Sequence, residues 1–303
     1  MLFSKTLFLY IIIPLLLISG CKNSEKNLIP QSISEVNEIK KREIPQEFKD
    51  YWYSGHAEIT SYNLLQERYG ELRKGKVVNI FVTEDFLPEI QVKADNVSEE
   101  NIPVLKINQV KNYLTGIYPY SVMTSTFSPV YNTDHAIKVS FSMQEWCGHA
   151  YVQLNGKKNF EIVSHSYFEG EADQELSITK TWLESELWNI IRLNPNELPT
   201  GDIQVLPSFE YFRMSHQEIK PHEAYGKLMQ GDSITTYTLE YPAIKRSLSI
   251  YFNSHFPYEI ERWEEIHPNG LKTTAEKLHR ITSKYWSQNG TQFEFLRDSL
   301  LLN

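Results

Sequence analysis

The chain has 303 residues, of which 41% are hydrophobic and 22% are charged, and it carries two cysteines. This composition is typical of a folded globular protein and excludes collagen-like, disordered and disulfide-rich classes. The formal net charge of −8 at pH 7 argues against a nucleic-acid partner, because binding to phosphates needs clustered Lys and Arg.

Residues 1–20 are predicted to be a signal peptide. Lys5 gives them a positively charged start, and the run Leu7–Ile18 is apolar apart from Tyr10 and Pro14. This run is shorter than the ~20 apolar residues of a membrane-spanning helix, whereas its length fits the apolar region of a secretory signal.

Cys21 follows the leader directly, in the run Ile18-Ser19-Gly20-Cys21. Two small residues before a cysteine at this place resemble the lipobox of bacterial lipoproteins. The resemblance implies cleavage before Cys21, a diacylglycerol on its sulfur and an acylated amine, and several acyl chains would give a stable membrane anchor. An ordinary signal peptide with a chance cysteine is the alternative. Lys22 does not resemble an inner-membrane retention signal, so we expect the outer membrane.

Residues 21–44 are predicted to be a flexible tether, and residues 45–303 a single β-rich domain. The tether is polar, rich in Ser, Asn, Glu and Lys, and shows no sustained periodicity. Pro45–Asp50 predicts a short helical turn, with proline at an allowed early position.

Strand patterns dominate from Tyr51 onward. Ala57–Leu65 and Val77–Val82 are expected to form a hairpin through a turn at Arg73-Lys74-Gly75. Further strands are predicted at Val104–Ile107, Ser121–Pro129, Ala136–Met143, Trp146–Leu154, Phe160–Phe168, Asp202–Leu206, Tyr237–Tyr241, Ser247–Phe252 and Glu259–Glu264. Because strands follow strands without regular helical crossovers, we expect a mainly β fold, a large curved antiparallel sheet or open barrel with one or two short helices.

Two segments carry helical patterns. Thr181–Ile191 has apolar residues near a 3.6-residue spacing, and Asn194-Pro195 follows as an end signal. Thr274–Trp286 is a second, weaker pattern. We therefore predict a helix in each segment.

The segment around Cys147 contains the candidate catalytic residues. Alternation along a strand places Glu145, Cys147, His149 and Tyr151 on one face and the apolar residues on the other. The partner strand must match this apolar face, which brings His165 to the face of Cys147 and His149.

This face could serve two kinds of chemistry. Cys147, His149 and His165 are the types that a thiol nucleophile and its base require. Glu145, His149 and His165 are weak candidates for a small metal site. A buried cysteine and a hydrogen-bonded sheet histidine, with no chemistry, are the alternative. The sequence has no phosphate-binding loop, dinucleotide glycine motif, CxxC pair or HExxH motif, so we expect no cofactor.

Four segments carry a family resemblance: Tyr51–Tyr62, Thr115–Ser121, Gln144–His149 and Ser166–Asp173. Together they resemble an uncharacterised group of bacterial envelope lipoproteins whose members often carry the label "septum formation inhibitor Maf". The label implies a role in cell division. The early Ser-x-Ser-Pro-Arg-Arg motif of cytoplasmic Maf nucleotide pyrophosphatases has no counterpart in this chain, so no catalytic residue can be transferred.

The sequence thus predicts a lipid-anchored envelope protein that binds a hydrophobic ligand or an envelope protein partner. Its expected architecture is similar to open, curved-sheet periplasmic proteins that hold lipids or lipoproteins, and such a function needs a concave apolar face. A thiol- or metal-dependent envelope hydrolase using Cys147, His149 and His165 is one alternative. A septum-formation role and a structural lipoprotein without a small-molecule site are two others.

Overall fold

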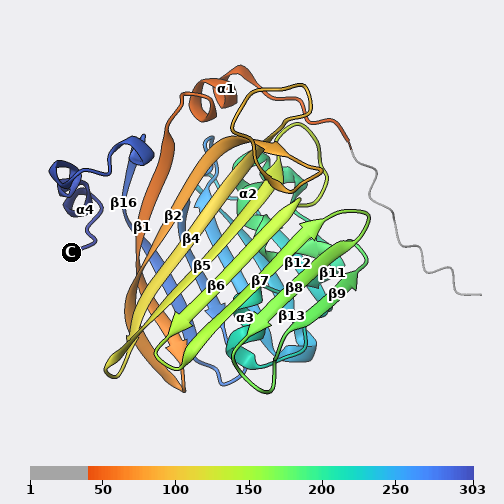
Figure 1. Ribbon diagram of the computed structural model, residues 1–303, viewed down its shortest axis with the longest axis vertical. Coiled ribbons are helices and arrows are strands. Elements are labelled where there is room, and N and C mark those ends of the chain that lie inside the picture. The colour runs from red at the N-terminus through yellow and green to blue at the C-terminus, as the bar shows by residue number, and fades with distance from the viewer. Residues whose placement is uncertain (1–39) are drawn as a thin grey trace, which may run out of the picture. The chain divides into compact units, whose positions relative to one another are not determined.

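A computed structural model describes residues 40–303, which belong to one compact unit. The predicted leader, Cys21 and the tether up to residue 39 lie outside the described residues. Within them, the expectation of a mainly β fold is confirmed, because one 16-stranded curved sheet is accompanied by short helices (Figure 1).

The strands of the sheet alternate in direction, and most pair with their neighbours in the sequence. They are β1 (Ala57–Arg68), β2 (Glu71–Leu87), β3 (Val92–Lys93), β4 (Ile102–Thr115), β5 (Tyr118–Pro129), β6 (Lys138–Glu145), β7 (Gly148–Gly156), β8 (Phe160–Ser166), β9 (Gln174–Ile178), β10 (Trp182–Leu183), β11 (Gly201–Leu206), β12 (His222–Met229), β13 (Ile234–Tyr241), β14 (Arg246–Asn253), β15 (Ile260–Ile266) and β16 (Lys272–Ser283).

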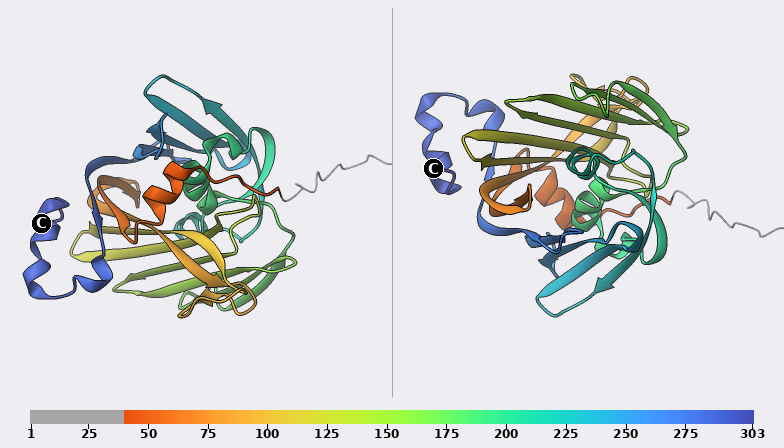
Figure 2. Two further views of the ribbon diagram at one scale, coloured as in Figure 1. Left: turned by 90° about the horizontal axis from the view of Figure 1, so that it is seen from above. Right: turned by 90° about the horizontal axis from the view of Figure 1, so that it is seen from below.

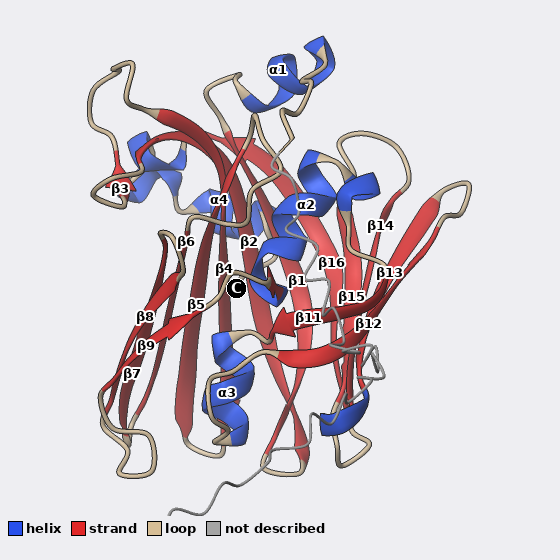
Figure 3. Ribbon diagram, turned by 90° about the vertical axis from the view of Figure 1, so that its right-hand side faces the viewer, coloured by secondary structure: helices blue, strands red, loops and turns tan. Residues whose placement is uncertain are grey.

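The order of strands runs from β10 through β11–β16 to β1, β2 and β4, and on through β5–β8 to β9, with β3 paired to β2. Every neighbouring pair is antiparallel except β10 and β11. The two edges, β9 and β10, come from consecutive stretches of the chain, so the sheet curves until its two ends face the same side (Figure 3).

The helical segments are short. They are α1 (Gln46–Trp52), η1 (Glu184–Glu186), α2 (Leu187–Leu193), η2 (Pro195–Glu197), α3 (Phe209–Ser215), η3 (Pro242–Ile244), η4 (Tyr285–Ser287), η5 (Thr291–Phe293) and α4 (Phe295–Ser299), where η marks a 3₁₀ turn. Figures 2 and 3 show α2 inside the curve of the sheet, and Figure 3 shows α3 between its two arms.

Helix α2 is buried on all sides, which explains its sequence, Leu-Trp-Asn-Ile-Ile-Arg-Leu. A helix with apolar side chains on several sides needs a core around it. Its two polar residues have buried partners: Asn189 donates to the carbonyl oxygens of Leu105 and Thr126, and Arg192 donates to the Glu58 carboxylate. Core side chains and helices therefore occupy the concave side of the sheet.

Both predicted helices need correction. In Thr181–Ile191 the α-helix begins only at Leu187, because Trp182 and Leu183 pair with β11 and the Glu186 side chain accepts a hydrogen bond from the Leu183 N–H at 3.0 Å. The helix predicted at Thr274–Trp286 is wrong. This segment is largely strand β16, whose backbone pairs with β15 on one side and β1 on the other, and these tertiary partners outweigh a weak local pattern.

The first hairpin is confirmed, but its turn lies elsewhere. The chain reverses at Tyr69-Gly70, where both residues have positive φ, and β2 begins before the predicted turn. Gly75 lies inside β2 at a close approach of β4, since a Cβ there would stand 2.3 Å from the Asn112 carbonyl oxygen. Gly75, which suggested a turn, is instead needed for the close approach of β2 and β4.

The folded unit begins before Pro45. Lys41 forms a β-bridge with Asn132, and the Arg42 side chain is buried. Arg42 donates hydrogen bonds to the Glu197 carboxylate and to the Val130 carbonyl oxygen at 2.6 Å. The last residues of the predicted tether are therefore part of the fold, and α1 corresponds to the predicted helical turn.

Candidate functional site

The faces of the β7–β8 hairpin are those expected. Its inner face carries buried apolar side chains: Ala150, Val152, Leu154, Phe160 and Ile162. His149 and His165 lie on the outer, exposed face, where His165 is directly opposite Tyr151 and its Nδ1 lies 3.3 Å from Asp173. Trp146, expected on the apolar face, is 68% exposed instead, because it lies in the turn between β6 and β7.

Cys147 lies in the same turn and is exposed, so the alternative in which it is a buried core residue is wrong. Its backbone N–H donates to Glu145 Oε2 at 2.7 Å. A hydrogen bond from the thiol to Glu145, together with the negative charge of that carboxylate, raises the pKa of Cys147. A raised pKa disfavours the thiolate, which is the nucleophilic form.

The structure brings His149 and His165 to one face and leaves Cys147 in the turn beyond it. Among residues 40–303, no group of three or more His, Cys, Asp or Glu side chains is arranged to hold a metal ion. The weak metal candidates Glu145, His149 and His165 therefore do not form such a group in this part of the chain.

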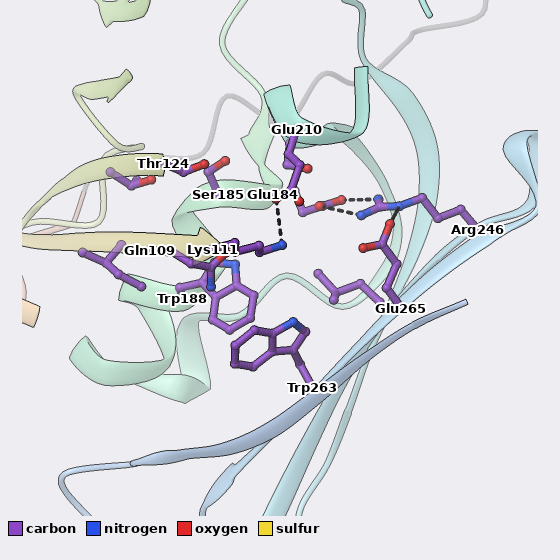
Figure 4. A pocket seen from close by; sticks show the side chains of 14 residues that line it. Gln109, Lys111, Thr124, Glu184, Ser185, Trp188, Glu210, Arg246, Trp263 and Glu265 are labelled. Atoms are coloured by element: carbon purple, nitrogen blue, oxygen red, sulfur yellow. Dashed lines mark hydrogen bonds and ion pairs between the residues drawn. The ribbon is translucent and has the colours of Figure 1, made fainter. Parts of the chain in front are cut away.

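A small polar cavity lies inside the curved sheet, next to α2 (Figure 4). It is lined by Ile107, Gln109, Lys111, Thr124, Thr126, Glu184, Ser185, Trp188, Ser208, Glu210, Arg246, Leu248, Trp263 and Glu265. Its volume is about 40 Å³. Since one water needs roughly 10–15 Å³ on this measure, the cavity has room for about three water molecules.

Arg246 organises the charges of this cavity. Its two terminal nitrogens donate to Glu184 at 2.5 and 2.8 Å, and its Nε donates to Glu265 at 2.6 Å. The Tyr241 hydroxyl also donates to Glu184, at 2.7 Å. Burial alone would raise the pKa of Glu265, but the charge of Arg246 outweighs it and lowers the pKa to about 2.

The other cation of the cavity is paired as well, since Lys111 Nζ donates to Glu210 at 2.7 Å. Two buried polar atoms of the lining have no protein partner, Nε2 of Gln109 and Oγ1 of Thr126. A polar cavity of this size satisfies such atoms with ordered water. With these charges already paired, the arrangement is suited to fixing the positions of η1, α3 and β14.

A second charge cluster joins α2 to β1. Arg192 donates to both oxygens of the Glu58 carboxylate at 2.6 Å, and the Tyr51 hydroxyl of α1 donates to the same group. Burial alone would raise the pKa of Glu58, but the charge and hydrogen bonds of Arg192 outweigh it and lower the pKa. An open hollow of about 250 Å³ lies beside this cluster, lined mainly by residues 50–58.

One end of the sheet carries exposed apolar side chains on consecutive turns. We call this the hairpin end and define it as the turns at Tyr69–Gly70, Gly116–Ile117 and Trp146–Cys147, the loop 167–173, and Leu114 near the end of β4. Ile117 is 83% exposed, Tyr167 is 77% exposed, and Tyr69 and Leu114 are 60% and 59% exposed. Figure 1 shows these turns together at the bottom of the sheet, opposite α1.

Aromatic contacts hold the hairpin end in place. The hydroxyl oxygens of Tyr69 and Tyr120 lie 2.9 Å apart, and the rings of Tyr118 and Trp146 lie 6.2 Å apart. Tyr167 lies against Gly148, where a Cβ would come within 2.7 Å of its ring. The contact between Tyr118 and Trp146 links two neighbouring hairpins.

Sequence reasoning found neither the charged cavity nor the hairpin end. The cavity joins residues from η1, α3, β4, β14 and β15, and the strand pattern of β4 or β14 gives no sign of such partners. The hairpin end did have a signal, because Ile117 follows Gly116 in a turn and Trp146 precedes Cys147-Gly148. Large apolar residues in turns are candidates for contact surfaces.

No helix within residues 40–303 has the length and apolar character needed to span a membrane. No protein-family model and no curated protein matches the chain. Among solved structures, it is similar to a beta-barrel-like protein from Brucella abortus, assigned to the domain of unknown function DUF1849. That similarity has a TM-score of 0.45 and 8% sequence identity, and it covers 75% of this chain and 98% of the other.

Proposed function

We propose that this chain is a lipid-anchored protein of the cell envelope that acts by binding, through its hairpin end. The anchor is the acylated Cys21 that the leader and lipobox resemblance imply. The observation that carries the binding surface is the set of exposed apolar side chains on consecutive turns, among them Ile117, Trp146 and Tyr167. Exposed apolar groups gathered in one place are typical of contact sites.

The packing inside the curved sheet favours binding at this surface and argues against a hydrophobic ligand held inside the sheet. The concave side is filled by α2 and by core side chains, and the interior cavity of about 40 Å³ is lined by charged and polar groups. Ligand pockets usually measure ~300–1,000 Å³ and are mostly apolar. A ligand of lipid size would have to displace α2, whose seven residues are all buried.

The anchor is tested by expressing the full chain with its leader in a bacterial host and supplying radioactive palmitate. We expect label on the wild-type protein and its recovery with membranes, and the loss of both in Cys21→Ser. Unlabelled wild-type protein in the cytosolic fraction would refute the proposal.

The binding surface is tested in the same cells with a photo-crosslinking amino acid at position 117. The matched control is position 97, because Val97 is 89% exposed but lies in the loop between β3 and β4, at the other end of the strands. We expect envelope adducts from position 117 and few from position 97. Equal yields of cross-linked adducts from the two positions would refute the hairpin end as the binding surface.

A further inference from the structure

We propose that the partner of the hairpin end is the surface of a lipid bilayer with zwitterionic headgroups. Ile117 and Leu114 insert among the acyl chains, and Trp146 and Tyr167 lie at the headgroup level. This inference rests on the proposed function, because it names the partner of the same surface.

The residue types at the hairpin end fit a membrane interface. Trp and Tyr favour the headgroup region because an apolar ring and a polar group share one side chain. Aliphatic side chains such as Ile117 gain by leaving water for the acyl chains. Leu114, Ile117, Trp146 and Tyr167 combine both types on neighbouring hairpins.

The form of the surface favours a bilayer over a folded protein partner. Ile117, Trp146 and Tyr167 are exposed in separate turns and loops at the end of the sheet that lies at the bottom of Figure 1. Neither of the two hollows described above includes these residues or Leu114. A protein partner must match such projections with a shaped surface of its own. Lipids rearrange around projecting side chains, so a bilayer accepts them without a complementary shape.

The charges near the apolar side chains favour zwitterionic lipids. Glu71 and Arg73 form an ion pair of 2.5 Å, and Glu171 is paired with Arg213 at 2.9 Å. Lys74 and Glu145 carry opposite charges, and Glu169 and Asp173 in the loop 167–173 add negative charge at this end. Because there is no strong excess of positive charge to attract anionic lipids, we expect apolar insertion that resists salt.

The tether gives the hairpin end access to the bilayer that holds Cys21. The described chain starts at the opposite end of the strands, where the Lys40 N–H donates to the Thr133 side chain. The stretch 22–39 spans at most about 60 Å when fully extended, and the 12 residues of β1 rise about 40 Å. The tether is therefore long enough for both attachments to engage one membrane, and each then strengthens the other.

The test uses the mature chain, residues 21–303, with Cys21→Ser, so that no acyl chain contributes to binding. We measure flotation with phosphatidylcholine vesicles in 0.1 M and 1 M salt. We expect the protein to float at both salt concentrations and Ile117→Asp to reduce the bound-to-free ratio about tenfold, the loss of burial of one aliphatic side chain. Val97→Asp, the matched control at the opposite end, should float like the parent.

A second readout uses Cys147, which is then the single cysteine of the chain. An environment-sensitive dye on Cys147 should brighten when phosphatidylcholine vesicles are added, because the dye enters an apolar region next to Trp146. Thermal unfolding of each variant establishes that it is folded, since Ile117 and Val97 are both exposed loop residues.

Several outcomes would overturn the inference: no flotation of the folded parent, equal loss in both Asp variants, or binding only to anionic vesicles that 1 M salt reverses. A dimer that Ile117→Asp dissociates, without vesicle binding, would assign the surface to a second copy. Cross-linked protein adducts from position 117, without vesicle binding, would be consistent with the proposed function but would rule out the bilayer as the partner. Loss of palmitate labelling and membrane recovery would instead refute the anchor, whatever the vesicles show.

Discussion

The buried pair of Glu58 and Arg192 allows a quantitative test of how α2 is held inside the sheet. Both side chains are almost fully buried, at 2% and 1% exposure, and are joined by two hydrogen bonds of 2.6 Å. Glu58→Gln removes the negative charge and leaves the guanidinium with neutral partners. Removing one member of a buried ion pair usually costs about 3–5 kcal/mol, a large share of the ~5–15 kcal/mol that stabilises a folded protein.

The assay is urea unfolding at pH 7, followed by tryptophan fluorescence, for Glu58→Gln, Arg192→Met and the double variant. We expect each single change to lower the free energy of unfolding by about 3–5 kcal/mol. The double variant should lose much less free energy of unfolding than the two single variants added together, because it leaves no buried charge unpaired. The control is Lys272→Met, which removes an ion pair with Glu264 whose lysine is 46% exposed. It should lower the free energy of unfolding by less than about 1 kcal/mol.

The pH dependence of the free energy of unfolding provides an independent test of the same pair. Since the pKa of Glu58 is lowered in the fold, its contribution is fully present above the ordinary carboxyl pKa of 4.5 and is lost as the pH falls through the lowered value. The free energies of unfolding of the parent and Glu58→Gln should therefore converge in acid. Two results would refute the claim that this charge pair holds α2. One is a loss of less than about 1 kcal/mol in the free energy of unfolding of Glu58→Gln at pH 7, and the other is a loss in the double variant equal to the sum of the two single losses.

Three further predictions concern single sites. Cys147 should react with iodoacetamide in the native protein, and Glu145→Gln should speed the reaction near neutral pH because it removes the cause of the raised thiol pKa; equal rates would contradict this. Because the pKa of Glu265 is about 2, its contribution to stability should be lost between pH 4.5 and about 2, and acid unfolding curves of Glu265→Gln should lack this step. Gly75→Ala should destabilise the protein by about 1–3 kcal/mol in urea unfolding, because its Cβ would meet a β4 carbonyl oxygen at 2.3 Å, whereas Gly170→Ala, with open space around it, should be neutral.

The sequence by itself determined the features that depend on neighbouring residues. Alternation with period 2 predicted which side chains of the β7–β8 hairpin face the core, and Val152, Leu154, Phe160 and Ile162 are buried accordingly. The succession of strands without helical crossovers predicted a large curved antiparallel sheet. The leader and Cys21 are also local patterns, and their export and acylation remain predictions. Local rules work here because a pleated strand fixes the side of each residue within two positions.

Tertiary structure decided what depends on distant partners. Strand β16 carries a weak helical pattern, but pairing with β1 and β15 satisfies its backbone in an extended form. Arg192 and Glu58 are 134 residues apart in the chain, and Arg246 and Glu184 are 62 apart. No local pattern identifies such partners, because burying a charge is favourable only when the folded sheet brings its counter-charge within hydrogen-bond distance.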